Sequence, residues 1–341
     1  DRVPFSPRMD FWYAARRSAG DMPLEFAGLS LREIEQKLDL ATPGRGGRIF
    51  RTVVDGITTT ERTEGERRIL EQHTPAGVLT TVTRQTTDQR TFGMAELVKK
   101  YPLTPQGISA EEIAKKWGIE RPEADEFALG SYEKAKRARD EGRFDREILP
   151  VDVQLEGLPA TIKTDEGIRD TSLEKLASLQ PSFRPDGVHH AGNSSQITDG
   201  AAAVLLMAKE KAEELGVKAR ARIIGQAVVG SDPVLMLTGP ITATPKVLAK
   251  AGLKLSDIDL IEINEAFASV PLAWKREVKP DMSKVNVNGG AIALGHPLGA
   301  TGARLMTTLL HELERTGGRY GMQLMCCGGG LGTATIIERL D

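Results

Sequence analysis

The 341-residue sequence is poor in cysteine: it holds two, and they are adjacent, at Cys326 and Cys327. Neighbouring cysteines cannot link distant parts of a chain, so a disulfide-stabilised secreted domain is excluded and we expect a reducing, cytoplasmic setting. The five histidines show no metal-ligand spacing, so we expect no metal site.

The sequence also lacks long apolar runs and a strong net charge. Its longest notable apolar run, residues 201–208, is far shorter than the ~20 residues that span a bilayer, so we expect no membrane partner. The formal net charge of -2 gives no sign of the positive charge that attracts nucleic acid, so we expect no nucleic-acid partner. The glycines form no Gly-x-Gly-x-x-Gly fingerprint of a dinucleotide site.

What the chain does hold is an ordinary globular composition, with 40% hydrophobic and 27% charged residues, and a length that predicts about two domains.

Its basic residues are unevenly placed. Residues 1–92 hold thirteen arginines and one lysine, whereas residues 93–341 hold fourteen arginines and seventeen lysines. This shift indicates two sequences of different origin, fused near residue 92.

The segment 1–92 predicts an α+β piece with strands at residues 48–55 and 78–84, because both runs are rich in β-branched residues. Its opening Asp1-Arg2-Val3-Pro4-Phe5, and the reversal Gly65-Glu66-Arg67-Arg68 that leads to residues 73–79, resemble uroporphyrinogen-decarboxylase-like proteins. That barrel family includes corrinoid methyltransferases. A partial barrel cannot close its sheet, so the family's activity is not carried over with the resemblance.

Residues 93–218 predict a helical region. A capping-box pattern, Ser109-Ala110-Glu111-Glu112, predicts a helix that begins at Ser109, and a second helix is expected over residues 121–139. A short strand is expected at 148–153. The small polar run 191–200 precedes a predicted apolar helix at 201–207, and the preceding His189 and His190 are interpreted as loop residues outside catalysis.

Strands and helices alternate through residues 219–341. Strands are expected at 221–229, 258–263, 320–326 and 332–340, with an extended piece at 284–287, and helices at 243–251, 265–274 and 299–313. Leu305, Leu309 and Leu313 share one face of the last helix. Such alternation predicts a layered α/β domain with helices on the faces of a sheet.

Three motifs follow one another in this half: Asn264-Glu265-Ala266-Phe267, Gly295-His296-Pro297, and Cys326-Cys327-Gly328. Taken alone, each has an ordinary structural interpretation, as a helix cap, a turn and a strand end. Together, in this order and at these separations, they resemble the catalytic half of thiolases. Residues 94–218 are similar to the end of the first thiolase half and to the loop region that thiolases use to bind coenzyme A.

The resemblance implies a layered α/β thiolase fold and acyl-CoA C-acyltransferase activity in fatty acid metabolism, by thiolysis of a 3-oxoacyl-CoA or by condensation of acetyl-CoA. It implies that His296 donates to the thioester oxygen, that Asn264 holds a water as second donor, and that Cys326 exchanges a proton with the α-carbon. Gly328 would supply a main-chain N–H to a second oxyanion site, and Ser195 would contact the pantetheine arm. Coenzyme A is then a substrate, no cofactor is bound permanently, and a homo-oligomer is expected.

The nucleophilic cysteine of the first thiolase half has no candidate upstream of Cys326. The usual route attaches an acyl group to that cysteine, so we expect impaired activity. Three function classes therefore remain open. They are a thiolase-type acyltransferase, a noncatalytic coenzyme A-binding or subunit-pairing protein, and a decarboxylase or methyltransferase relative through residues 1–92.

Overall fold

The computed structural model describes residues 28–29, 33, 58–64, 67–74, 77–84, 101–155 and 158–340. The chain forms two compact units, divided between Pro102 and Leu103, and each is treated by itself. The strand expected at 48–55 lies outside the described residues. The domain boundaries expected at residues 92 and 218 stay predictions.

The first unit contains an antiparallel sheet of β1 (Thr58–Glu64), β2 (Arg67–Thr74) and β3 (Gly77–Arg84), in that order. The strand predicted at 78–84 is confirmed. Glu64 pairs with Arg67 in the ladder, so Arg67 and Arg68 open β2 and do not belong to the predicted reversal.

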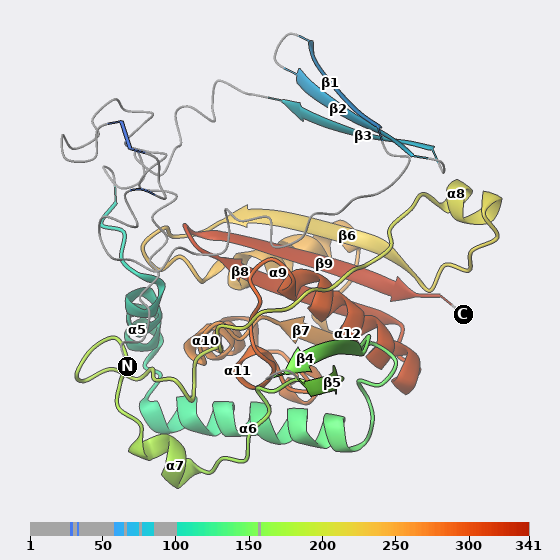
Figure 1. Cartoon of the computed structure of the whole chain (residues 1–341). Helices are drawn as coiled ribbons and strands as arrows, with labels where there is room; N and C mark the ends of the chain where they lie inside the picture. The colour runs from blue at the N-terminus through green and yellow to red at the C-terminus, as the bar shows by residue number, and fades with distance from the viewer. Residues whose placement is uncertain are drawn as a thin grey trace. The chain divides into compact units, whose positions relative to one another are not determined.

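The second unit begins with two helices and a hairpin (Figure 1): α5 (Gln106–Trp117), α6 (Arg121–Asp140), β4 (Val151–Leu155) and β5 (Leu158–Ile162). The helix at 121–139 is confirmed, and the short strand lies three residues later than expected. Two short helices follow, α7 (Leu173–Ser178) and α8 (Lys209–Glu214).

The predicted capping box at Ser109 is wrong. Helix α5 begins three residues earlier, after Pro105, and Ser109 lies inside it. The Ser109 hydroxyl is fully buried and donates to the carbonyl oxygen of Val234 at 2.7 Å, while Glu111 accepts hydrogen bonds from the main-chain N–H groups of Val188 and His189. Both side chains join distant segments and do not cap the helix.

The apolar helix predicted at 201–207 is also absent; these residues have no regular secondary structure and are exposed. A helix of seven residues is too short to be stable without an apolar face packed on a neighbour. The run is apolar on every side, so burying one face would still leave the others in water.

The remaining strands form one mixed sheet in the order β6 (Ala221–Gly230), β9 (Leu331–Arg339), β8 (Tyr320–Cys327) and β7 (Leu260–Ile263). Strand β9 runs antiparallel to both of its neighbours, and β7 runs parallel to β8. Val285 makes an isolated parallel bridge to Ile261. The extended piece predicted at 284–287 is confined to this residue, because Lys284 ends a 3-10 turn and the chain bends at Asn286.

Helices cover both faces of this sheet, as the alternation predicts (Figure 1). Helix α9 (Gly239–Ala251) ends at Gly252 in a left-handed conformation, and it shares a buried core with β6, β9 and Trp274 of α10 (Ser269–Val278). Helix α12 (Thr301–Thr316) packs Leu309 and Leu313 on Leu260 and Ile337 from the other face. Two 3-10 turns, Leu255–Asp257 and Met282–Lys284, and the short helix α11 (Ala291–Leu294) complete the unit.

Helix α10 starts four residues later than expected, at Ser269. The residues before it pair with a distant segment: Ser195 N–H donates to Ala266 O at 3.0 Å, and Ala268 N–H donates to Asn193 O at 3.0 Å. These bonds use main-chain groups that a helix from residue 265 would require for itself.

Replacing Leu313 with alanine should lower the free energy of unfolding by about 2–5 kcal/mol, because its side chain is fully buried between α12 and the sheet. Urea unfolding of the full chain measures this. Leu149→Ala is the matched control: that leucine is 83% exposed, and its loss should change stability by less than about 0.5 kcal/mol. Equal effects would contradict the packing described for α12.

Candidate active site

The candidate site begins where two parallel strands end. Asn264 follows β7, and Cys326 lies near the end of β8. Parallel strands finish at the same edge of a sheet, and the Asn264 N–H donates to Leu324 O at 3.0 Å across the pair. The Asn264 Nδ2 amide therefore reaches Cys326 Sγ, at 3.8 Å.

The Cys326 thiol is 7% exposed and belongs to the apolar core of the helical region. Burial raises the pKa of this thiol to about 12, and the Asn264 amide opposes the rise because it stabilises the thiolate. Cys326 is thus a neutral thiol at physiological pH. The adjacent Cys327 is half-buried, and burial raises its pKa as well.

The glycines after the cysteines form the turn between β8 and β9. Gly328 is exposed at its start. Gly330 has a φ of 81°, and a Cβ there would lie 2.8 Å from the carbonyl oxygen of Ser231. Only glycine fits this close approach without strain. The turn leaves the main chain at Gly328 open to solvent beside Cys326.

The His296 ring is hydrogen-bonded to Thr301, a residue that no sequence motif indicates. Its Nδ1 lies 2.7 Å from Thr301 Oγ1, and the Thr301 hydroxyl donates its single proton to Pro297 O at 3.0 Å. Thr301 must then accept from the ring, so His296 carries its proton on Nδ1 and a lone pair on Nε2. Nε2 has no hydrogen-bond partner among the described residues.

The imidazole of His296 is neutral in this setting. Burial lowers the pKa of His296 first, and the positive charge of Arg304 lowers it further. A neutral ring with an open Nε2 can accept a proton near pH 7 and can then donate it.

A buried network fixes the loop that carries His296. The His296 N–H donates to Gln196 O at 2.9 Å, and the Gln196 amide donates to Gly167 O and Ile292 O at 3.0 and 2.9 Å. Glu265 accepts from the Ile292 N–H at 3.2 Å and from Ser131 Oγ at 2.7 Å. The motif that holds Asn264 therefore also anchors α11, which precedes His296.

Ser195 lies beside the same motif. Its N–H bonds to Ala266 O, and the neighbouring Ser194 bridges to Phe267 in antiparallel fashion. Ser195 is half-buried and adjoins Gln196, which binds the His296 main chain. The structure thus joins Asn264 directly to Cys326, and connects Ser195 and His296 to the Asn264 motif through main-chain bonds.

His189 and His190 are fully buried in structural contacts. His190 Nε2 lies 2.7 Å from Asp125 Oδ1, and His189 Nδ1 lies 3.4 Å from Glu111 Oε1. These pairs tie the loop at 188–190 to α5 and α6.

Glu262 and Glu265 have separate partners. Glu262 lies 3.7 Å from Arg304, and burial raises its pKa to about 8, whereas Glu265 bonds to Ser131 and Asn286.

Within the part of the chain that the structure describes, no group of three or more metal-ligating side chains occurs. The described helices also include none that combines the length and apolarity needed to cross a bilayer.

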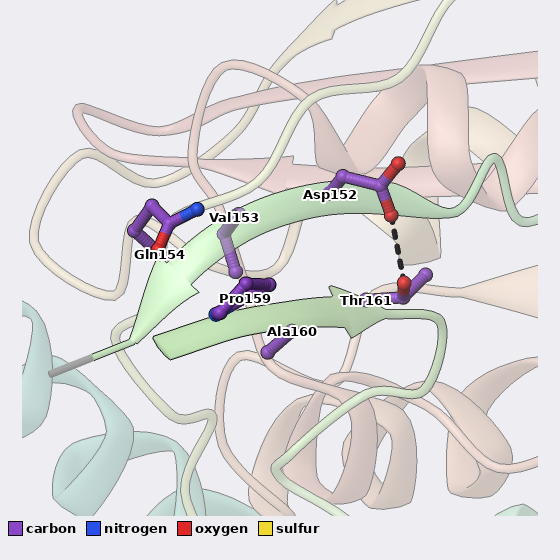
Figure 2. Close-up of a pocket in the computed structure, with 6 residues that line it drawn as sticks. All are labelled: Asp152, Val153, Gln154, Pro159, Ala160 and Thr161. Carbon is purple, nitrogen blue, oxygen red and sulfur yellow. Dashed lines mark hydrogen bonds between the residues drawn. The ribbon is translucent and has the colours of Figure 1, made fainter. Parts of the chain in front are cut away.

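Figure 2 shows a separate hollow of about 550 Å³ over the β4–β5 hairpin, where Thr161 donates to Asp152 at 2.7 Å. Its lining residues come from the two strands alone, between Asp152 and Thr161. None of the predicted site residues contributes to it.

Two family descriptions match the chain: "Thiolase, N-terminal domain" over residues 71–210 and "Thiolase, C-terminal domain" over residues 217–339. Together they cover well over half of it. The chain belongs to the thiolase family. The N-terminal match begins inside the segment 1–92, and the resemblance of that segment to uroporphyrinogen-decarboxylase-like proteins stays a prediction.

Similar proteins include two named thiolases and an acetyl-CoA acetyltransferase. Steroid 3-ketoacyl-CoA thiolase FadA6 of Mycobacterium tuberculosis is 52% identical over 68% of this chain and 56% of its own length. Acetyl-CoA acetyltransferase of Chromobacterium violaceum is 49% identical over 71% and 62%. Human mitochondrial 3-ketoacyl-CoA thiolase, solved in complex with CoA, has a TM-score of 0.65 and 44% identity over 69% and 59%. The chain thus spans less than two thirds of these thiolases.

Replacing Thr301 with valine should remove the hydroxyl oxygen that accepts the hydrogen bond from His296 Nδ1. Both neutral tautomers of the imidazole should then be populated. Thr301→Ser keeps the hydroxyl and should keep the Nδ1–H form. The ¹⁵N shifts of the labelled imidazole, assigned with His296→Gln, measure the tautomer directly. Identical imidazole shifts in the wild type and the valine variant would contradict the assigned role.

Cys326 should react slowly with iodoacetamide, because a pKa of about 12 leaves on the order of one thiolate in ten thousand at pH 8. With Cys327 replaced by serine, alkylation should be at least about a hundredfold slower than for a free thiol. Its rate should keep rising with pH above pH 9. A plateau near pH 8.5 would contradict the buried, neutral thiol.

Proposed function

We propose that this chain carries the part of a thiolase site that holds a coenzyme A thioester and moves a proton at its α-carbon. The observation that carries the proposal is the contact of the Asn264 amide with the Cys326 thiol, on a motif that also anchors the His296 loop. The similarity to thiolases supports acyl-CoA C-acyltransferase chemistry as its class.

The geometry suits an enolate reaction. Breaking or making a bond beside a thioester places negative charge on its oxygen, and preorganised donors stabilise that charge. In this proposal the His296 Nε2 lone pair takes the proton of the coenzyme A thiol as its sulfur bonds to the 3-oxo carbon of the substrate. The bond from that carbon to the α-carbon then breaks, and the imidazolium donates to the thioester oxygen of the released enolate. Asn264 is buried, and its Oδ1 has no partner among the described residues. This oxygen is therefore available to accept a hydrogen bond from a water, and that water would be the second donor to the thioester oxygen.

Cys326 is suited to give up a proton to a strong base and poorly suited to remain ionised. A thiol with a pKa of about 12 can protonate the carbanion released by cleavage of a 3-oxoacyl-CoA, and then regain a proton. This supports the thiolysis direction. Ser195 would face the pantetheine arm of coenzyme A. The open turn at Gly328 would face the oxygen of the second oxyanion site.

A noncatalytic coenzyme A-binding protein is the second candidate, and one observation favours it. The full sequence has no cysteine besides Cys326 and Cys327, both on β8. A covalent route through an acyl-cysteine needs a thiol across the substrate from the proton-transferring one. The complete thiolase reaction by this chain alone is therefore expected to be impaired.

Steady-state thiolysis of acetoacetyl-CoA should be very slow or absent, and mass spectrometry should detect no acyl-enzyme. An ordinary enzyme turns over at ~10 per second. Turnover within tenfold of that value, together with an acyl group found on Cys326 by mass spectrometry, would contradict the proposal because Cys326 would then do the covalent work.

Exchange of the acetyl-CoA methyl protons in D₂O separates the two candidates, since it needs no acyl-cysteine. The wild-type chain should catalyse slow exchange, followed by proton NMR, and Cys326→Ala should lose it. Cys327→Ala is the matched control and should retain exchange. Binding of coenzyme A without any exchange would instead establish the noncatalytic candidate.

A further inference from the structure

The segment 193–196 contacts both parts of the candidate site. Its main chain makes one hydrogen bond with Ala266 and one with Ala268, each 3.0 Å long, in the motif that begins at Asn264. It also accepts the main-chain N–H of His296 at 2.9 Å. A group that fixes this segment therefore fixes the main chain around Asn264 and His296 together.

The segment follows a tight turn, and one buried amide closes that turn. The Asn193 N–H donates to His190 O at 3.2 Å, and the His190 N–H donates to Asn193 Oδ1 at 2.9 Å. The two protons of the Asn193 amide go to Val188 O at 3.0 Å and to Asp125 Oδ1 at 2.9 Å. The amide of this fully buried asparagine thus uses its acceptor and both of its donors.

The His190 ring completes the turn in one tautomer. The Gly192 N–H donates to the ring Nδ1 at 3.1 Å. A main-chain N–H can only donate, so Nδ1 carries a lone pair and the ring proton lies on Nε2, which is 2.7 Å from Asp125 Oδ1. This tautomer is the opposite of the one assigned to His296.

Asp125 on α6 is the common acceptor of this network. Its Oδ1 accepts from both His190 and Asn193, and its Oδ2 lies 3.6 Å from Arg121 Nε, one turn earlier on the helix. The Asp125 side chain is 5% exposed, and a carboxylate buried to this degree needs opposite charge and hydrogen bonds to offset its lost hydration. The four side chains therefore form one unit, which holds the turn against α6.

We propose that His190 and Asp125 are positioning residues for the candidate active site: they hold the turn that fixes segment 193–196 beside both parts of the site. Neither side chain needs to contact a substrate. Ser195 lies in the segment, so loss of the bond between His190 and Asp125 should weaken coenzyme A binding, and the released His296 loop should slow proton exchange. These effects on the reaction rest on the proposed function, whereas the hydrogen-bond network does not.

Two variants of the full chain separate the bond to Asp125 from other effects. His190→Gln has an Nε2 amide that can still donate to Asp125, whereas the shorter side chain of His190→Asn cannot reach it. In His190→Asn the amides of Ala268 and His296 should exchange with D₂O at least about tenfold faster, while the amides of β9 keep their protection. His190→Gln should stay close to the wild-type rates. The matched control is His311→Leu, which changes a histidine on α12 outside this network and should leave both amides unchanged.

The ¹⁵N shifts of the labelled histidines test the network in the unaltered chain. His190, assigned with His190→Gln, should be protonated on Nε2, and His296 should be protonated on Nδ1. Exchange of the acetyl-CoA methyl protons supplies the activity measurement. It should be at least about tenfold slower in His190→Asn than in His190→Gln, because only the glutamine keeps the bond to Asp125.

Four results would overturn the inference. These are a His190 ring protonated on Nδ1, amides of Ala268 and His296 that stay protected in His190→Asn, equal loss of protection in β9, or equal effects of the asparagine and glutamine variants. The third would assign His190 to general stability. If the amides respond as expected and the wild type exchanges no methyl protons, the positioning stands and the proposed function fails. Methyl exchange by the wild type without the amide response would have the opposite meaning.

Discussion

The candidate site depends on the parallel pairing of β7 with β8. That ladder brings the ends of two strands, more than sixty residues apart in sequence, to one edge of the sheet. The Asn264 N–H is bonded to Leu324 O, and this register aims the Asn264 amide at the Cys326 thiol. A shift of one residue would turn one of the two side chains to the opposite face. The chemistry therefore rests on the register of a four-residue strand.

That strand is short, and buried polar groups around it maintain the arrangement. Asn286 accepts from the Ile263 N–H at 2.8 Å and donates to Glu265, which in turn binds the start of α11. Gln196 fastens the His296 main chain to the same region. Each of these groups is costly to bury without its partner, by about 1–3 kcal/mol, so the loops keep one arrangement.

The sequence predicted the strands and helices of residues 219–341 well, because apolar runs, β-branched residues and stops such as Gly252 report local conformation. It predicted the contact of Asn264 with Cys326 only through family resemblance. The late start of α10, the role of Thr301 and the extended run at 201–207 were missed. The start of α10 depends on bonds to Asn193 and Ser195, which are far away in the chain, and local pattern does not record such bonds. Thr301 is only five residues from His296, but nothing in the motif marks that threonine as its hydrogen-bond partner. The run at 201–207 has an apolar pattern that does not by itself decide between a helix and another structure.

In the proposed function, Cys326, Asn264 and His296 act on one substrate position. The most direct measurement is a crystal structure of the full chain soaked with acetyl-CoA. The thioester oxygen should lie within hydrogen-bond reach of His296 Nε2, about 2.6–3.2 Å, with the methyl group facing Cys326 Sγ. A thioester bound elsewhere, or His296 and Cys326 opening to opposite faces of the domain, would contradict it.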